Sequence, residues 1–174
     1  MLRFNSDHKF KIMQIADTQE IPAVSPDTLS LINNALDREK PDLVIFTGDQ
    51  IKGYSKKFKK DPVIIESTID ILVEPIAKRN IPFMVTYGNH DAQCGVDNRG
   101  QYKFYAKYDN FISGDLRNSD DVGTADIQIY SSTEDKPVFE LYIIDSHGKA
   151  KDGAGYAPVD KKQIAVSYTH LTLP

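Results

Sequence analysis

The chain of 174 residues contains no tryptophan and one cysteine, Cys94, which excludes an internal disulfide and a cysteine-rich zinc site. It also lacks an apolar run of the roughly 18 residues that a membrane span needs, so no membrane association is expected. The start, Met1 to Lys11, is polar and of mixed charge, unlike a secretory signal. These absences favour a cytoplasmic location.

An excess of positive charge is also lacking, since 21 lysine and arginine residues stand against 25 aspartate and glutamate residues and the formal net charge is −4, so a nucleic-acid partner is not expected. The one basic run, Lys56-Lys57-Phe58-Lys59-Lys60, lies between two predicted elements. Such a run can attract an anionic substrate, but it is more typical of a solvated loop. The sequence gives no indication of the oligomeric state.

The last nine residues, Val166 to Pro174, carry no acidic or basic side chain except His170 and do not continue the preceding pattern. They resemble one reading-frame translation of a transposon adapter used in preparing sequencing libraries. We therefore expect residues 1–165 to be the N-terminal part of a longer domain and residues 166–174 not to be native sequence. A genuine C-terminal strand is the alternative.

Three short apolar runs predict buried parallel strands, namely Phe10–Ala16, Leu43–Thr47 and Phe83–Tyr87. Two helices are predicted between them. One starts at Ser25-Pro26 and ends before Pro41; the other starts at Asp61-Pro62 and carries Pro75, which should kink it or end its regular hydrogen bonding.

Beyond residue 90 the pattern loosens. A short aromatic-rich helix is predicted over residues 101–111, and residues 126–130 and 138–145 predict a hairpin. The order of elements indicates an α/β sandwich of mixed sheets flanked by helices, in a single domain that is incomplete at its C-terminus.

Polar residues follow each of the three apolar strands. The strings are Asp17-Thr18-Gln19, Gly48-Asp49 and Gly88-Asn89-His90-Asp91. Asp17 and Asp49 are 32 residues apart, and Asp49 and Asn89 are 40 apart, which suits successive βαβ units. Because ligands bind at the carboxyl ends of parallel strands, these side chains are expected to converge.

Carboxylate, amide and imidazole groups suit divalent manganese, iron or zinc. Two such ions can hold a bridging hydroxide that attacks a phosphorus atom in line. The alternative is that Asp17, Asp49 and Asp91 merely stabilise turns, which is a common use of aspartate.

The three strings, in this order and spacing, resemble the D-x-H, G-D-x-x and G-N-H-[DE] motifs of the calcineurin-like metallophosphoesterases, in a purple-acid-phosphatase-like branch. The resemblance implies a dinuclear centre that hydrolyses a small-molecule phosphate ester. It implies that Asp17 binds one metal, Asp49 bridges both and Asn89 binds the second. It also implies that His90 stabilises or protonates the leaving oxygen, while Asp91 orients His90.

The chain departs from that pattern in three ways. Gln19 stands where the family has a histidine, so it is expected to be a weaker ligand or to hold a water. Lys52 stands where purple acid phosphatases have a tyrosine. Nothing in residues 92–165 matches the two later histidine motifs; His147 is the only candidate, and a loop histidine is the favoured interpretation.

These departures lead to the expectation that the fragment itself is inactive, whereas its parent is a phosphomonoesterase or phosphodiesterase. The rival hypothesis is a non-catalytic metal-binding or scaffold protein with the same fold, which Gln19 supports.

Overall fold

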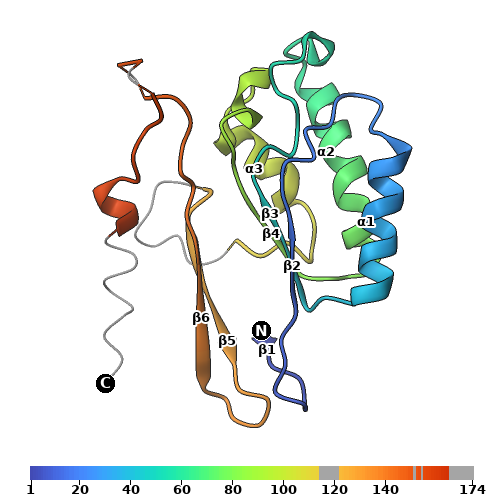
Figure 1. The fold of residues 1–174 in the computed structure, drawn as a ribbon, viewed down its shortest axis with the longest axis vertical. Coiled ribbons are helices and arrows are strands. Elements are labelled where there is room, and N and C mark those ends of the chain that lie inside the picture. The colour runs from blue at the N-terminus through green and yellow to red at the C-terminus, as the bar shows by residue number, and fades with distance from the viewer. Residues whose placement is uncertain (114–121, 151, 154, 165–174) are drawn as a thin grey trace.

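The computed structural model describes residues 1–113, 122–150, 152–153 and 155–164. The segment from 166 to 174, predicted to be non-native, lies outside these described residues. Among these residues, two three-stranded sheets and the helices α1, α2 and α3 form the main body of the fold, and a single helical turn follows at residues 161–164 (Figure 1).

The first sheet has the order β2-β3-β4, and all of its strands are parallel. These strands are Ile12–Ile15, Leu43–Thr47 and Phe83–Thr86. All three lie where the sequence predicted them, although β2 and β4 are shorter. Helices α1 (Pro26–Glu39) and α2 (Pro62–Ala77) connect the strands and lie together on one side of the sheet (Figure 1).

The second sheet has the order β1-β5-β6, with β1 at Leu2–Arg3, β5 at Ala125–Tyr130 and β6 at Pro137–Ile143. Strands β5 and β6 form the predicted antiparallel hairpin, and β1 pairs with β5 in parallel. This sheet packs on the face of β2-β3-β4 that the helices leave open.

The side chains of β3 point alternately into the two hydrophobic cores, one on each face of the sheet. Val44 and Phe46 belong to the core under the helices, whereas Leu43 and Ile45 belong to the core shared with the second sheet. Successive side chains of a strand point to opposite faces, so a strand buried on both faces must be apolar throughout. The predicted fold class, an α/β sandwich of two sheets flanked by helices, is confirmed.

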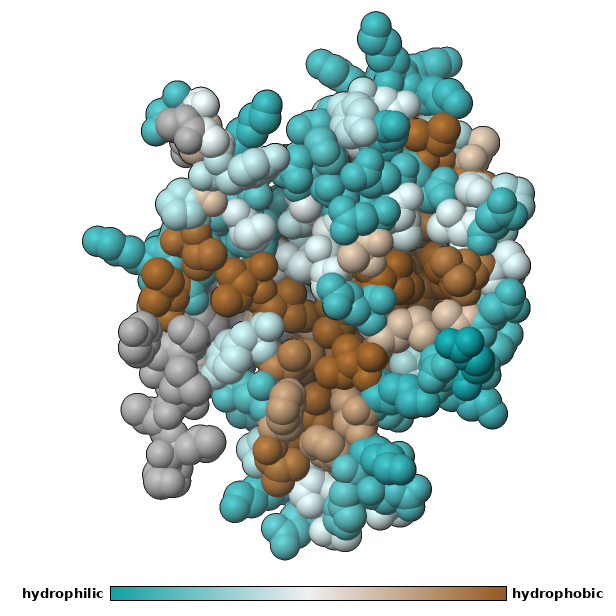
Figure 2. Space-filling view, viewed as in Figure 1, coloured by the Kyte–Doolittle hydropathy of each residue, from teal (hydrophilic) through white to brown (hydrophobic). Residues whose placement is uncertain are grey.

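Strand β2 differs from its prediction as a strand covered on both faces. Met13 and Ile15 pack against the helix-side core, but Gln14 is exposed and the exposed fraction of Ile12 is 38%. The reason is its position at the edge of the sheet, beyond the part that the hairpin covers. Figure 2 shows hydrophobic side chains gathered in the middle of this face of the molecule.

The helix starts illustrate two capping arrangements. The Asp61 carboxylate accepts a hydrogen bond from the Val63 amide and caps α2, as predicted. Ser25 occupies the cap position of α1, but its side chain makes no capping bond. Buried Glu20 accepts from the Ser25 amide and from the Thr28 hydroxyl instead.

The remaining helical elements are short. Helix α3 spans Asn98–Ala106, so it starts three residues and ends five residues earlier than predicted. The 3-10 turns η1 and η2 span Lys56–Phe58 and Asp91–Cys94. Helix α2 continues two residues beyond Pro75, which lies in its last turn. No helix among the described residues is long and apolar enough to cross a membrane.

Candidate metal-binding pocket

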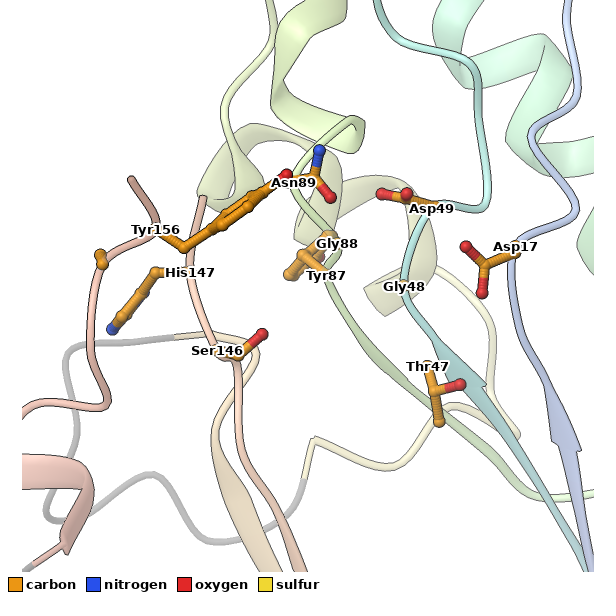
Figure 3. A pocket seen from close by; sticks show the side chains of 11 residues that line it. Asp17, Thr47, Gly48, Asp49, Tyr87, Gly88, Asn89, Ser146, His147 and Tyr156 are labelled. Carbon is orange, nitrogen blue, oxygen red and sulfur yellow. The ribbon is translucent and has the colours of Figure 1, made fainter. Parts of the chain in front are cut away.

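A pocket of about 360 Å³ lies at the carboxyl ends of β2, β3 and β4 (Figure 3). One side, which we call the strand wall, is formed by residues at or just beyond the ends of the three parallel strands: Asp17, Thr47, Gly48, Asp49, Tyr87, Gly88 and Asn89. The other side, the loop wall, comes from the segment after β6 and consists of Ser146, His147, Tyr156 and Ala157. The predicted convergence of Asp17, Asp49 and Asn89 is observed.

The three strand ends are joined through their backbones. The Asp17 amide donates to the Gly48 carbonyl at 3.0 Å, and the Gln19 amide donates to the Asp49 carbonyl at 2.9 Å. Asp17, Gln19 and Asp49 all adopt positive φ values of 53°, 43° and 53°. This left-handed conformation is unfavourable for residues other than glycine, and such strain tends to collect at functional sites.

Two glycines allow β3 and β4 to end in direct contact. A Cβ atom added to Gly48 would lie 2.7 Å from the Gly88 nitrogen, and one added to Gly88 would lie 2.1 Å from Asp49 Oδ1 and 2.6 Å from the Asp49 nitrogen. No side chain fits either place. The missing methyl groups therefore leave the space in which the Asp49 carboxylate lies.

The Asp91 carboxylate bonds to three backbone amides. Its Oδ2 accepts hydrogen bonds from the Asp49 and Gly88 amides, both at 2.8 Å, and its Oδ1 accepts from the Ile51 amide at 3.2 Å. Burial raises the pKa of this carboxyl to about 6, and the three amide hydrogen bonds oppose the rise. Asp91 thus braces the ends of β3 and β4 against each other. These three bonds do not involve the His90 ring, and a role of Asp91 in orienting His90 stays a prediction.

The His90 ring is held by other residues. Its Nδ1 lies 3.1 Å from the Gln93 side-chain oxygen, and the Gln93 amide group donates to the Asn89 carbonyl at 3.1 Å. The Tyr54 ring meets it edge-on, with the ring centres 4.7 Å apart. The backbone amide of His90 donates to Asp49 Oδ1. The ring itself does not line the pocket.

Gln19 is half-buried and is not among the residues that line the pocket, unlike Asp17 two residues earlier. Its amide bond to the Asp49 carbonyl fixes the turn in which it stands. The metal-binding role predicted for its side chain thus receives no support from the shape of the pocket.

Whether the pocket suits a metal depends on its donors. Asp17, Asp49 and Asn89 offer two carboxylates and one amide oxygen, which fit a hard or borderline divalent cation. Within the described ranges, no group of three or more His, Cys, Asp or Glu residues is placed to hold a metal ion. The three oxygen donors fit one cation, while a pair would need additional ligands.

Sequence reasoning missed most of the loop wall. Ser146 and His147 lie three and four residues beyond Ile143, the end of β6, a position that could have suggested them. His147 was set aside as a loop histidine, yet it lines the pocket; its Nε2 bonds to the Gln163 side chain, and Figure 3 shows that ring end turned away from Asp49. Tyr156 stands in an unpatterned segment that gave no signal.

Fold and pocket together define an α/β sandwich with an oxygen-rich site at the carboxyl ends of its parallel strands. Residues 10–167 match the family model described as Calcineurin-like phosphoesterase. The chain therefore belongs to the calcineurin-like phosphoesterase family.

Several curated proteins are similar over most of the chain. Probable inactive purple acid phosphatase 14 of Arabidopsis thaliana is 28% identical over 182 residues, which cover 89% of this chain and 44% of that protein. Phosphatase DCR2 of Saccharomyces cerevisiae is 32% identical over 181 residues, covering 91% and 30%. Probable inactive purple acid phosphatase 29 of Arabidopsis thaliana is 27% identical over 170 residues, covering 83% and 42%. The chain thus spans less than half the length of these relatives.

Proposed function

We propose that the chain forms part of the catalytic domain of a metal-dependent hydrolase of small-molecule phosphate esters. The observation that carries the proposal is the convergence of Asp17, Asp49 and Asn89 from three strand ends into one pocket. Membership of the phosphoesterase family supports the same reaction class. Residues 1–165 would be the family's N-terminal part, with residues 166–174 outside it.

Asp17, Asp49 and Asn89 would hold divalent metal, with manganese, iron and zinc as the candidates. Metal ions bound there would supply positive charge for the phosphoryl oxygens and acidify water. Asp49 is the most firmly positioned of the three for metal binding. Its Oδ1 accepts a hydrogen bond from the His90 amide, and its own backbone amide donates to the Asp91 carboxylate.

His90 would serve the leaving oxygen. A glutamine side-chain oxygen only accepts hydrogen bonds, so the contact with Gln93 places the proton of the neutral ring on Nδ1. The Gln93 amide group is oriented by its own bond to the Asn89 carbonyl, which supports this assignment. Nε2 is then the atom that gives or takes a proton during the reaction.

A second candidate is a non-catalytic metal-binding or scaffold protein with the same fold. It is favoured by the position of Gln19 outside the pocket lining and by the three-oxygen donor set. Two of the relatives named above also carry the word inactive in their names. Metal binding is common to both candidates, and hydrolysis belongs to the first alone.

Two measurements test the proposal. Calorimetric titration of the purified chain with Mn²⁺ should show binding that Asp49→Asn removes and that Asp109→Asn, a change at an exposed aspartate in the loop after α3, leaves intact. Because the fragment itself is expected to be inactive, hydrolysis of p-nitrophenyl and bis-p-nitrophenyl phosphate with Mn²⁺ is measured on the full-length parent protein, where it should depend on Asp49. Metal binding without turnover by the parent would favour the second candidate, and absence of metal binding would reject the hydrolase.

A further inference from the structure

The loop between β3 and α2 carries an unusual density of positive charge for a chain of net charge −4. Five lysines fall within nine residues: Lys52, Lys56, Lys57, Lys59 and Lys60. All but half-buried Lys52 are exposed, and none of the five takes part in an ion pair within the described part of the chain. Figure 2 shows hydrophilic side chains over the end of the molecule where this loop lies in Figure 1.

The loop has a fixed backbone. Phe58, in the middle of the run, is 1% exposed and belongs to the helix-side core. The Ser55 hydroxyl accepts from the Lys57 amide, and the Asp61 amide donates to the Phe58 carbonyl. With Phe58 anchored, the flanking lysines are held close together and repel one another. The carboxylate of the adjacent Asp61 caps α2 and forms no ion pair with them.

The same loop packs against the segment that carries His90. A Cβ atom added to Gly53 would lie 2.0 Å from the His90 carbonyl oxygen, so the two backbones are in close contact. The Tyr54 ring meets the His90 ring, and the Lys52 ammonium lies 5.2 Å from the centre of the Tyr54 ring. The side chain of Lys60 packs on Gly95, five residues beyond His90. The lysines are therefore attached to the His90 side of the site.

The positive charge of these lysines can offset the negative charge of the strand wall. The strand wall presents the carboxylates of Asp17 and Asp49, which repel a phosphate ester. Cations beside such a site attract an anionic ligand and raise its local concentration. His90 is the residue assigned to the leaving oxygen, so cations on its side would meet the leaving group rather than the phosphoryl group that is transferred.

We infer that the β3–α2 loop binds the leaving group of a polyanionic substrate, a small phosphate ester that carries at least one further phosphate. This inference rests on the proposed function for the role of His90. A pocket of about 360 Å³ is of the size that holds a small molecule, which favours such a substrate over an acidic protein. On this inference the β3–α2 loop binds substrate and is not merely the solvated loop that its sequence alone favoured.

The test uses sodium tripolyphosphate as the probe, titrated calorimetrically into the full chain in metal-free buffer. The test variant is Lys56→Gln/Lys57→Gln. The control is Lys9→Gln/Lys136→Gln, which removes the same charge from two exposed lysines. These lie in the β1–β2 loop and the β5–β6 turn, at the other end of the molecule in Figure 1.

Binding of tripolyphosphate should be about tenfold weaker in the test variant, unchanged in the control, and weakened by added salt in the wild-type chain. Equal losses in the two variants, or no binding by the wild type, would overturn the inference. A polyglutamate peptide is the second probe, and stronger lysine-dependent binding of this peptide would also overturn it, because the loop would then recognise acidic protein.

The titration needs neither metal nor turnover, so its outcome is separate from that of the proposed function. Lysine-dependent binding of tripolyphosphate, together with no hydrolysis by the full-length parent protein, would support the anion site and reject the hydrolase. Manganese-dependent hydrolysis of p-nitrophenyl phosphate by the parent protein, without lysine-dependent binding, would reject the anion site alone.

Discussion

The strand wall and the loop wall enclose one pocket but are held in different ways. In the strand wall, neighbouring strand ends exchange backbone hydrogen bonds, and one buried carboxylate, Asp91, collects three further amides. The loop wall has backbone bonds within its own segment, such as that from the Ala157 amide to the Gly148 carbonyl, but side chains join it to the rest of the fold. Gln163, 1% exposed, bonds to the His147 ring, the Thr124 hydroxyl and the Asp145 carbonyl.

This difference indicates which wall of the pocket binds metal. A network of backbone bonds and close glycine contacts can hold oxygen atoms at fixed positions, which a metal site requires. A wall in which one glutamine side chain makes several of the bonds to other segments is easier to vary without disturbing the fold. We therefore expect metal binding to depend on the strand wall and the loop wall to contribute little to it.

The largest effect is expected from Gly88→Ala. The added methyl group would meet Asp49 Oδ1 at 2.1 Å and the Asp49 nitrogen at 2.6 Å, so both the carboxylate and the backbone must move. Such overpacking should cost about 3 kcal/mol of folding free energy and remove Mn²⁺ binding. Thermal denaturation and Mn²⁺ titration measure the two effects.

Gly148→Ala, next to His147 of the loop wall, is the matched control. The nearest atom to its added methyl group is the Asn89 Cα at 3.9 Å, an ordinary contact. It should leave both stability and metal affinity unchanged. Equal damage from the two substitutions would contradict the division between the walls.

Asp91→Asn is expected to have the next largest effect. An asparagine would turn one of the two acceptor oxygens into an amide donor that faces a backbone N–H group, with no water to replace the lost bond. We expect a loss of about 2 kcal/mol in the free energy of unfolding at neutral pH, together with weaker Mn²⁺ binding. Urea denaturation checks the first value. A loss of metal binding without a loss of stability would show that Asp91 acts on the ligand rather than on the backbone.

Gln163→Leu is the counterpart in the loop wall. Leucine keeps much of the volume but cannot bond to His147, Thr124 or the Asp145 carbonyl. Stability should fall by about 1–2 kcal/mol, whereas the Mn²⁺ affinity should stay within about twofold of the wild-type value. Amide hydrogen exchange should increase in the Ser146–Ala157 segment and not at Asp49. Faster exchange at Asp49 would mean that the two walls are coupled.

The same division explains what the sequence could predict. Strands β3 and β4 are apolar runs, and a glycine and a polar residue follow each of them, after Tyr87 in the case of β4. The local sequence was therefore enough to predict the strand, its end and the position of the polar residue in the pocket. The capped start of α2 was readable for the same reason, because Asp61 and Pro62 are adjacent. The strand wall, built from such local signals and parallel topology, was predicted almost completely.

Other features depend on contacts between residues distant in sequence. The bonds of Asp91 reach back 40 and 42 residues to Ile51 and Asp49, and Gln163 reaches back 39 residues to Thr124. No periodicity records such contacts. The sequence consequently predicted neither the amide bonds of Asp91 nor the bonds that Glu20 makes at the start of α1.

The smallest effect is expected from His147→Asn, and it bears most directly on the metal site. Asparagine tolerates the left-handed backbone of this position, where φ is 63°, so the loop should keep its course. The ring already bonds to Gln163 through Nε2, which leaves the strand wall to supply the metal ligands. Mn²⁺ affinity should therefore change by less than about twofold, against its complete loss in Asp49→Asn. A tenfold loss on replacing His147 would instead make this histidine a ligand, and the division between a metal-binding wall and an adaptable wall would be wrong.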